Sequence, residues 1–218
     1  MIIVKNSMPD ADPRVSRPRG RPRSFDRKEA LAAAAKAFWH LGYEGASIVD
    51  LTGAMGITPQ SLYAAFGSKA ELYREAILWY RDEIGHLTQE ALADPDVIRA
   101  FERVLAVSAH EFTLPGRPAG CMISAALLVC ARENRAEADH VADYRAATIA
   151  LFKERLLRGV AEGQILPDID ADALARYYGA LIQGFTVQAR DGASEADLLP
   201  IARLAGAELA RYRASAHS

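Results

Sequence analysis

Apolar side chains recur at helical spacing along almost the whole chain. In the first such segment, Leu31, Ala34 and Phe38 lie on one face of a helix. A capping box at residues 26–29 opens this helix, and Gly42 predicts its end. No segment alternates polar and apolar residues like a strand with turn residues on both sides. The pattern predicts an all-α protein.

Two short helices follow, separated by a tight turn. A second capping box at residues 47–50 opens the first of them, and Gly56 stops it. Thr58 caps the next helix, whose first position holds Pro59, where a missing N–H is harmless. Five apolar positions can pack into one small core with the preceding helix: Leu51, Met55, Ile57, Leu62 and Phe66. This spacing fits either a plain helical hairpin or a helix-turn-helix on a three-helix base.

The rest of the chain is organised in longer segments. A capping box at residues 68–71 opens a helix that continues toward Ile84. Further helices are predicted near residues 96–113, 121–132, 136–162, 171–190 and 195–213. We therefore divide the chain into a disordered basic arm, a helix-turn-helix domain and a larger helical body, at residues 1–24, 25–70 and 71–218.

Charge is unevenly distributed, although the net charge is only −2. Residues 1–81 hold 12 Lys and Arg against 8 Asp and Glu, whereas residues 82–218 hold 14 against 20. A basic head on an acidic body indicates that only the head meets a polyanion. The proline-rich arm is either a solvated tail or a DNA-binding arm that lays arginines into a narrow minor groove. The candidates for that groove are Arg19, Arg21 and Arg23.

The outward face of the second short helix carries the candidate chemistry. With Leu62 and Phe66 directed inward, the residues left facing out are Thr58, Pro59, Gln60, Ser61, Tyr63 and Ala64. Gln60 can pair with adenine in a bidentate way, and Ser61 can donate or accept a hydrogen bond. Tyr63 and Lys69 suit phosphate oxygens, and Lys69 lies at a helix N-terminus that itself attracts anions.

The stretch Ser47–Leu72 closely resembles the DNA-binding signature of the TetR/AcrR family of bacterial regulators. Three features match it: the string Leu62-Tyr63-x-x-Phe66-x-x-Lys69, the Gly42-Tyr43 step and the Arg-Gly-Arg-Pro-Arg arm. The resemblance covers about residues 20–75. It implies a homodimer that represses transcription from a palindromic operator until a small-molecule inducer enters the C-terminal domain.

The resemblance also assigns roles to single positions. Gln60, Ser61 and Ala64 would meet base edges, and Ser47, Tyr63 and Lys69 would hold phosphates. Many relatives carry a larger contacting residue, such as His, where this chain has Ala64 and Ala65. We therefore expect fewer direct base contacts, with more weight on Gln60, Ser61 and the arginine arm.

In this family the body is a ligand-binding and dimerisation domain. The resemblance implies that the helices at 171–190 and 195–213, which both carry apolar stripes, pair with those of a second copy as a four-helix bundle. The pocket would lie among the middle helices and take a largely apolar effector. Its candidate residues are Trp79, Phe101, Leu105, Phe112, Met122, Tyr144, Phe152, Tyr178 and Gln183.

The two cysteines, Cys121 and Cys130, are nine residues apart. On one helix they would lie about 13 Å apart, too far for a disulfide, so we interpret them as small buried hydrophobes. The alternative is that Cys121 is a redox sensor, because a helix N-terminus at Gly120 would favour its thiolate. The five histidines form no i, i+3 or i, i+4 pair and there is no CxxC, so we expect no metal and no cofactor.

Other classes of protein fit the sequence less well. No apolar run approaches the roughly 18 residues of a spanning helix, so we expect a cytoplasmic protein without a membrane segment. The chain lacks GxSxG, GxGxxG and Walker motifs, so we expect no enzyme. A structural or partner-recruiting DNA-binding protein without an inducer remains the main alternative to a regulator.

Overall fold

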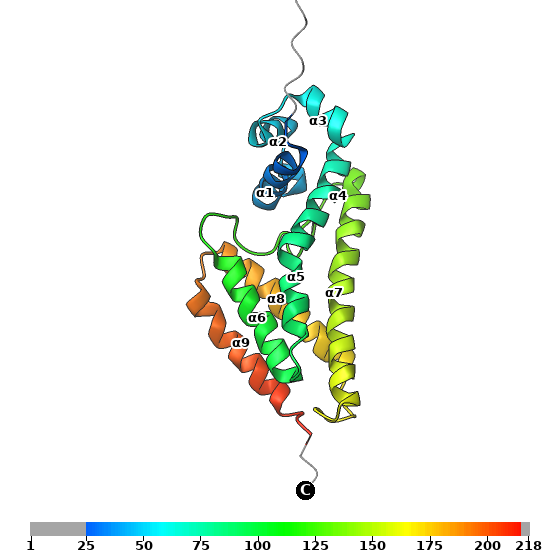
Figure 1. Ribbon diagram of the computed structural model, residues 1–218, viewed down its shortest axis with the longest axis vertical. Coiled ribbons are helices and arrows are strands. Elements are labelled where there is room, and N and C mark those ends of the chain that lie inside the picture. The colour runs from blue at the N-terminus through cyan, green and yellow to red at the C-terminus, as the bar shows by residue number, and fades with distance from the viewer. Residues whose placement is uncertain (1–24, 215–218) are drawn as a thin grey trace, which may run out of the picture.

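The computed structural model describes residues 25–214, and within them every named element is helical (Figure 1). A single isolated bridge pairs Ile165 with Arg213. The all-α prediction is therefore confirmed. The predicted arm, with Arg19, Arg21 and Arg23, lies outside the described residues. None of the described helices is long and apolar enough to cross a membrane.

Three helices form the N-terminal unit at one end of the molecule (Figure 1): α1 (Arg27–Gly45), α2 (Ile48–Met55) and α3 (Pro59–Phe66). Side chains cap all three as predicted. Asp26 accepts hydrogen bonds from two backbone N–H groups of α1, Ser47 forms a reciprocal capping box on α2, and Thr58 caps α3. Gly42 kinks α1 rather than ending it, at a φ of 76°. This compact arrangement confirms the helix-turn-helix.

A rod of helix joins this unit to the body. It consists of α4 (Lys69–Tyr80), a π-helical turn η1 (Arg81–Gly85) and α5 (His86–Leu92). Ser68 caps its start as predicted, and the helical path continues beyond the expected limit at Ile84. Leu72, Tyr73 and Ile77 of α4 are buried in the same core as α1, α2 and α3. The N-terminal core therefore extends past the predicted boundary at residue 70.

Four long helices build the body: α6 (Val97–Thr113), α7 (Arg135–Ala161), α8 (Ala171–Arg190) and α9 (Glu195–Ala210). They agree with four of the predicted segments, although α9 ends three residues early. Their core centres on three buried rings, with the Phe101 centroid 5.7 Å from Phe152 and 4.3 Å from Tyr178. In Figure 1, α7 runs beside α4 and α5, where Arg74 pairs with the buried Glu137 at 2.9 Å.

The predicted helix over residues 121–132 is wrong. This segment forms successive turns before a short 3₁₀ helix, η2 (Arg132–Asn134). Arg145 of α7 donates to the carbonyls of Ile123 and Ala126 at 3.1 and 3.0 Å, and those are oxygens that a helix would use for its own bonds. Leu127 also adopts a left-handed φ of 49°, which interrupts a helix.

Candidate nucleic-acid interface and internal cavity

The outward face of α3 is held in position by its two buried residues, Leu62 and Phe66. Gln60, Ala64 and the half-exposed Tyr63 face solvent, as the sequence predicts. The Ser61 hydroxyl lies 3.0 Å from that of Thr58, which also accepts from the Ser61 backbone N–H. The hydroxyl of Ser61 is therefore hydrogen-bonded to the helix cap and retains the capacity for a further hydrogen bond to a base.

The two predicted phosphate-binding residues outside α3 lie beside the helix ends. The Lys69 ammonium is 4.7 Å from the centre of the Tyr43 ring. Partial burial lowers the pKa of Lys69, while Glu44 raises it. The Ser47 hydroxyl donates to the Asp50 carboxylate at 2.5 Å, and this bond lowers the pKa of Asp50. Both side chains are oriented before any DNA arrives.

Arg27 contacts the C-terminal end of α3. Its guanidinium lies 4.4 Å from the centre of the Phe66 ring, donates to the carbonyl of Ala65 at 3.3 Å and pairs with Glu75 at 2.7 Å. Because Arg27 is the first residue of α1, the chain enters the unit next to α3. The spacing of residues along the chain does not predict this contact.

A cavity of about 710 Å³ lies in the body between the rod formed by α4 and α5, helices α6, α7 and α8, and the turned segment near Cys121. Three of the nine predicted pocket residues line it: Phe112, Tyr144 and Gln183.

The other six predicted pocket residues do not line this cavity. Their side chains belong to the packed cores instead: Phe101, Leu105, Phe152 and Tyr178 in the body, and Met122 and Trp79 in or against the N-terminal core.

The cavity wall also carries polar groups. Tyr80 is buried, and this burial, together with the proximity of Cys121, raises the pKa of its phenol well above the usual value. Glu111 pairs with Arg117, and the Cys121 sulfur accepts from the Ser124 backbone N–H at 3.4 Å. The wall therefore combines apolar surface with a few fixed donors and acceptors, as small-molecule sites do.

The cavity is linked to the N-terminal unit through Trp39 of α1. The indole N–H donates to the carbonyl of Gly120 at 3.1 Å, and Arg190 of α8 donates to the carbonyl of Trp39 at 3.2 Å. The Arg117 guanidinium lies 5.6 Å from the indole, and the Tyr80 ring meets it edge-on at 5.0 Å.

Gly120 itself has a φ of 75°, and a Cβ there would lie 2.8 Å from the Thr186 carbonyl oxygen.

Comparison with known proteins agrees with this architecture. A family model for bacterial regulatory proteins of the tetR family matches residues 30–76. The HTH-type transcriptional repressor ComR of Escherichia coli (strain K12) is 34% identical over 190 residues, which are 86% of this chain and 90% of ComR. The repressor BdcR of the same organism is 29% identical over 198 residues, or 88% and 92% of the two chains. The chain belongs to the TetR family.

Solved structures of TetR-family regulators share its fold. A triple cysteine mutant of the regulator CifR, complexed with 26-bp double-strand operator DNA, is 39% identical with a TM-score of 0.84. The match covers 87% of this chain and all of that one. A TetR regulator from Rhodococcus sp. RHA1 is 36% identical with a TM-score of 0.58, over 87% and 100% of the two chains. This TetR-family protein is accordingly a transcriptional regulator of the helix-turn-helix type and not an enzyme.

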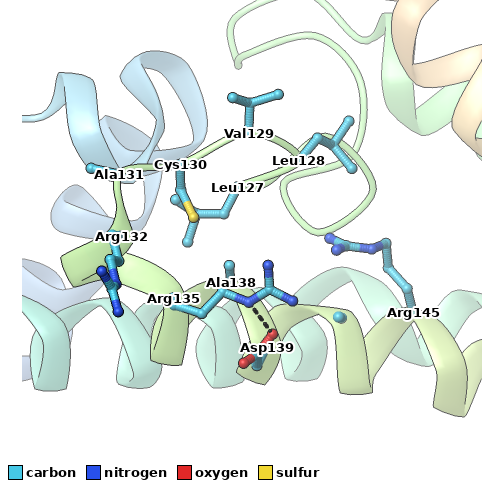
Figure 2. A pocket seen from close by; sticks show the side chains of 11 residues that line it. Leu127, Leu128, Val129, Cys130, Ala131, Arg132, Arg135, Ala138, Asp139 and Arg145 are labelled. Atoms are coloured by element: carbon cyan, nitrogen blue, oxygen red, sulfur yellow. Dashed lines mark hydrogen bonds and ion pairs between the residues drawn. The ribbon is translucent and has the colours of Figure 1, made fainter.

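The two cysteines of this TetR-family protein are free and partly buried. Because no helix contains both, the distance argument from helical rise does not apply to them, and no helix N-terminus lies at Cys121. Cys121 lines the large cavity, whereas Cys130 lines a second cavity of about 520 Å³ beneath the turned segment (Figure 2). Among the described residues, no group of three or more His, Cys, Asp or Glu could hold a metal ion.

Proposed function

We propose that this TetR-family protein is a homodimeric repressor that binds a palindromic operator and leaves it when a small molecule occupies the cavity. One observation carries the proposal: Trp39 of the DNA-binding unit is bonded directly to the segment that forms the cavity wall. The relatives ComR and BdcR are repressors, and the CifR structure contains operator DNA, which supports the same activity here. Such a protein acts in the cytoplasm, where the DNA lies.

The exposed face of α3 would enter the major groove. We assign base contacts to Gln60, Ser61 and Ala64, which follow the start of the helix at Thr58 and Pro59. Gln60 has the bidentate geometry for adenine. Phosphate contacts are assigned to Ser47, Tyr63 and Lys69, on either side of that face. The arm would add Arg19, Arg21 and Arg23 in the adjacent minor groove.

The dimer would form through α8 and α9. Tyr177, Ala180, Gly184 and Val187 make one stripe along α8, and the Val187 side chain is 56% exposed. A Cβ added at Gly184 would meet nothing within 4 Å, so a partner helix has room there. On α9, Leu204 is 70% exposed. An apolar stripe of this kind suits an interface with a two-fold partner.

Release would follow from linkage between the cavity and the recognition helices. An effector that favours one conformation of the body displaces the two copies of α3 from the roughly 34–36 Å spacing of successive major grooves. Only a difference in affinity between the two conformations can drive this change. Trp39 is placed to transmit it, since its partners Gly120 and Tyr80 lie at the cavity wall or next to it.

Cys121 offers a second route to the same response. Cys121 lines the large cavity, so a thiol-reactive electrophile that bonds to its sulfur would occupy part of the cavity. A Cys121→Ser variant that responds to electrophiles as the wild type does would exclude this route.

Fluorescence anisotropy with DNA from upstream of the protein's own gene tests the regulator directly. A scrambled fragment of equal length serves as control, and a salt series separates phosphate contacts from base contacts. We expect saturable binding that prefers the native fragment, with one or two protein dimers bound to each molecule of that fragment. Equal, salt-sensitive binding to both fragments would favour the structural DNA-binding protein instead.

A further inference from the structure

Arg145 of α7 lies where the two cavities meet, and it lines both of them. Figure 2 shows its side chain extending from α7 toward the turned segment. The guanidinium uses Nη1 to donate to the carbonyls of Ile123 and Ala126. Between residues 25 and 214 no carboxylate lies within ion-pair distance of it. Arg145 is thus a half-buried cation held only by two neutral oxygens.

The acidic residues of the large cavity do not neutralise this charge. Glu111 is paired with Arg117. Asp82 and Glu154 are exposed and form no ion pair with Arg145. A partly buried cation without a counter-charge is unfavourable, because burial removes hydration that two neutral carbonyls replace only in part. The lowered pKa of Arg145, caused chiefly by desolvation, reflects the same effect.

The surroundings of Arg145 suit a ligand with one polar end. Ser124 lines the cavity nearby, and the structure gives its hydroxyl no side-chain hydrogen bond among the described residues. One part of the wall is aliphatic and includes Leu87, Val107, Ile149 and Ile182, while other lining residues are polar. A guanidinium presents a planar fork of donors that matches a carboxylate or sulfonate in a bidentate way.

We propose that the effector of this cavity is an amphipathic anion, whose single negative group pairs with Arg145 and whose apolar body lies against the aliphatic wall. The inference rests on the proposed function, since it concerns the same cavity. It refines the expectation of a largely apolar effector by giving that molecule a charged end.

A matched pair of fluorescent probes tests the inference without knowledge of the natural effector. 8-Anilinonaphthalene-1-sulfonate and N-phenyl-1-naphthylamine share an aromatic body, but only the first carries a negative charge. We expect the anion to bind once per protomer and about tenfold more tightly than the neutral probe, as a charge-assisted hydrogen bond predicts. Equal affinities, or tighter binding of the neutral probe, would overturn the proposal.

Four variants locate the effect. Arg145→Gln should remove the preference for the anion, and Arg145→Lys should keep part of it. Arg81→Gln is the matched control, because Arg81 lines the same cavity but stacks on Tyr144 at 5.1 Å. It should keep the preference. Val107→Trp, which fills the large cavity, should weaken both probes.

The variants also show whether an effect on binding comes from the lost charge of Arg145 or from unfolding of the turned segment. Thermal unfolding of Arg145→Gln shows whether the turned segment has lost its support, and Arg145→Lys supplies the charged comparison if it has. Loss of the preference in Arg81→Gln but not in Arg145→Gln would contradict the proposal, as would the absence of binding by either probe. Operator binding is measured separately by anisotropy. If the anion proposal fails but the protein is a DNA-binding regulator, the wild type still binds its operator.

Discussion

The N-terminal unit and the body are both helical. The helices of the unit are specified by contacts between residues close in sequence, whereas the cavity of the body depends on contacts between distant segments. In the unit, a side chain caps the start of each helix: Asp26, Ser47 and Thr58 each cap one. In the body, the proposed effector cavity is assembled from five helices and a turned segment that are far apart in sequence. The predicted DNA-reading surface is therefore a local property of the chain, whereas the proposed effector site is a property of the whole fold.

The largest expected effect comes from breaking the core of the unit alone. Leu62→Ala removes a fully buried side chain and should lower the free energy of unfolding by about 3 kcal/mol. Operator binding should disappear, while the proposed α8–α9 dimer should remain in light-scattering measurements. Val49→Ala, at a 78% exposed position of the same unit, should change stability by less than about 0.5 kcal/mol. Loss of the dimer in Leu62→Ala would show that the two regions fold as one.

The second prediction concerns the junction between the regions. Gly120→Ala forces a Cβ into a left-handed residue against the Thr186 backbone, so urea unfolding should show a loss of about 2 kcal/mol. Operator affinity should fall too, since the Gly120 carbonyl holds Trp39. Gly53→Ala, where a Cβ meets nothing within 4 Å, should leave stability unchanged or slightly raised. Equal stability of the two variants would refute this account of the junction.

The third prediction separates base contacts from phosphate contacts within the unit. Gln60→Ala should reduce the preference for the operator by about 1–3 kcal/mol of discrimination. Lys69→Ala should weaken binding to every sequence and lower the salt slope by about 1. Anisotropy with operator and scrambled DNA measures both. If both variants lose affinity uniformly, Gln60 does not read a base.

The smallest effect compares identical capping boxes in the two regions. Ser47 and Asp50 open α2, and Ser194 and Asp197 open α9. The serine bonds lower the pKa of each aspartate in the folded state. Each carboxylate therefore stabilises the fold above its unfolded pKa near 3.9, and this stability is lost as the pH falls through the lowered value.

Asp50→Asn and Asp197→Asn should each remove part of that acid sensitivity. Urea unfolding between pH 2 and pH 6 should show the wild type losing its advantage over either variant toward the acid end. If the difference in free energy of unfolding between wild type and variant is the same at every pH, the carboxylates contribute through their shape rather than their charge.

Much of the unit could be predicted because its signals are short-ranged. Thr58 and Pro59 specify where α3 begins, and Leu62 and Phe66 specify which side is buried. The helix predicted at 121–132 fails because Arg145, more than a dozen residues further along the chain, takes the carbonyls of that segment. Periodicity also cannot distinguish a side chain that faces a cavity from one that faces a packed core. Phe101 and Phe112 lie on the same helix, but only Phe112 reaches the cavity.

The coupling between the N-terminal unit and the body can be measured without the natural effector. In a Cys130→Ser background, N-ethylmaleimide attached to Cys121 would fill part of the large cavity, and mass spectrometry would confirm a single adduct. If the two regions are coupled, operator affinity should fall at least about tenfold, the size of a typical coupling free energy, while the dimer persists. Unchanged operator affinity of the fully labelled protein would contradict it.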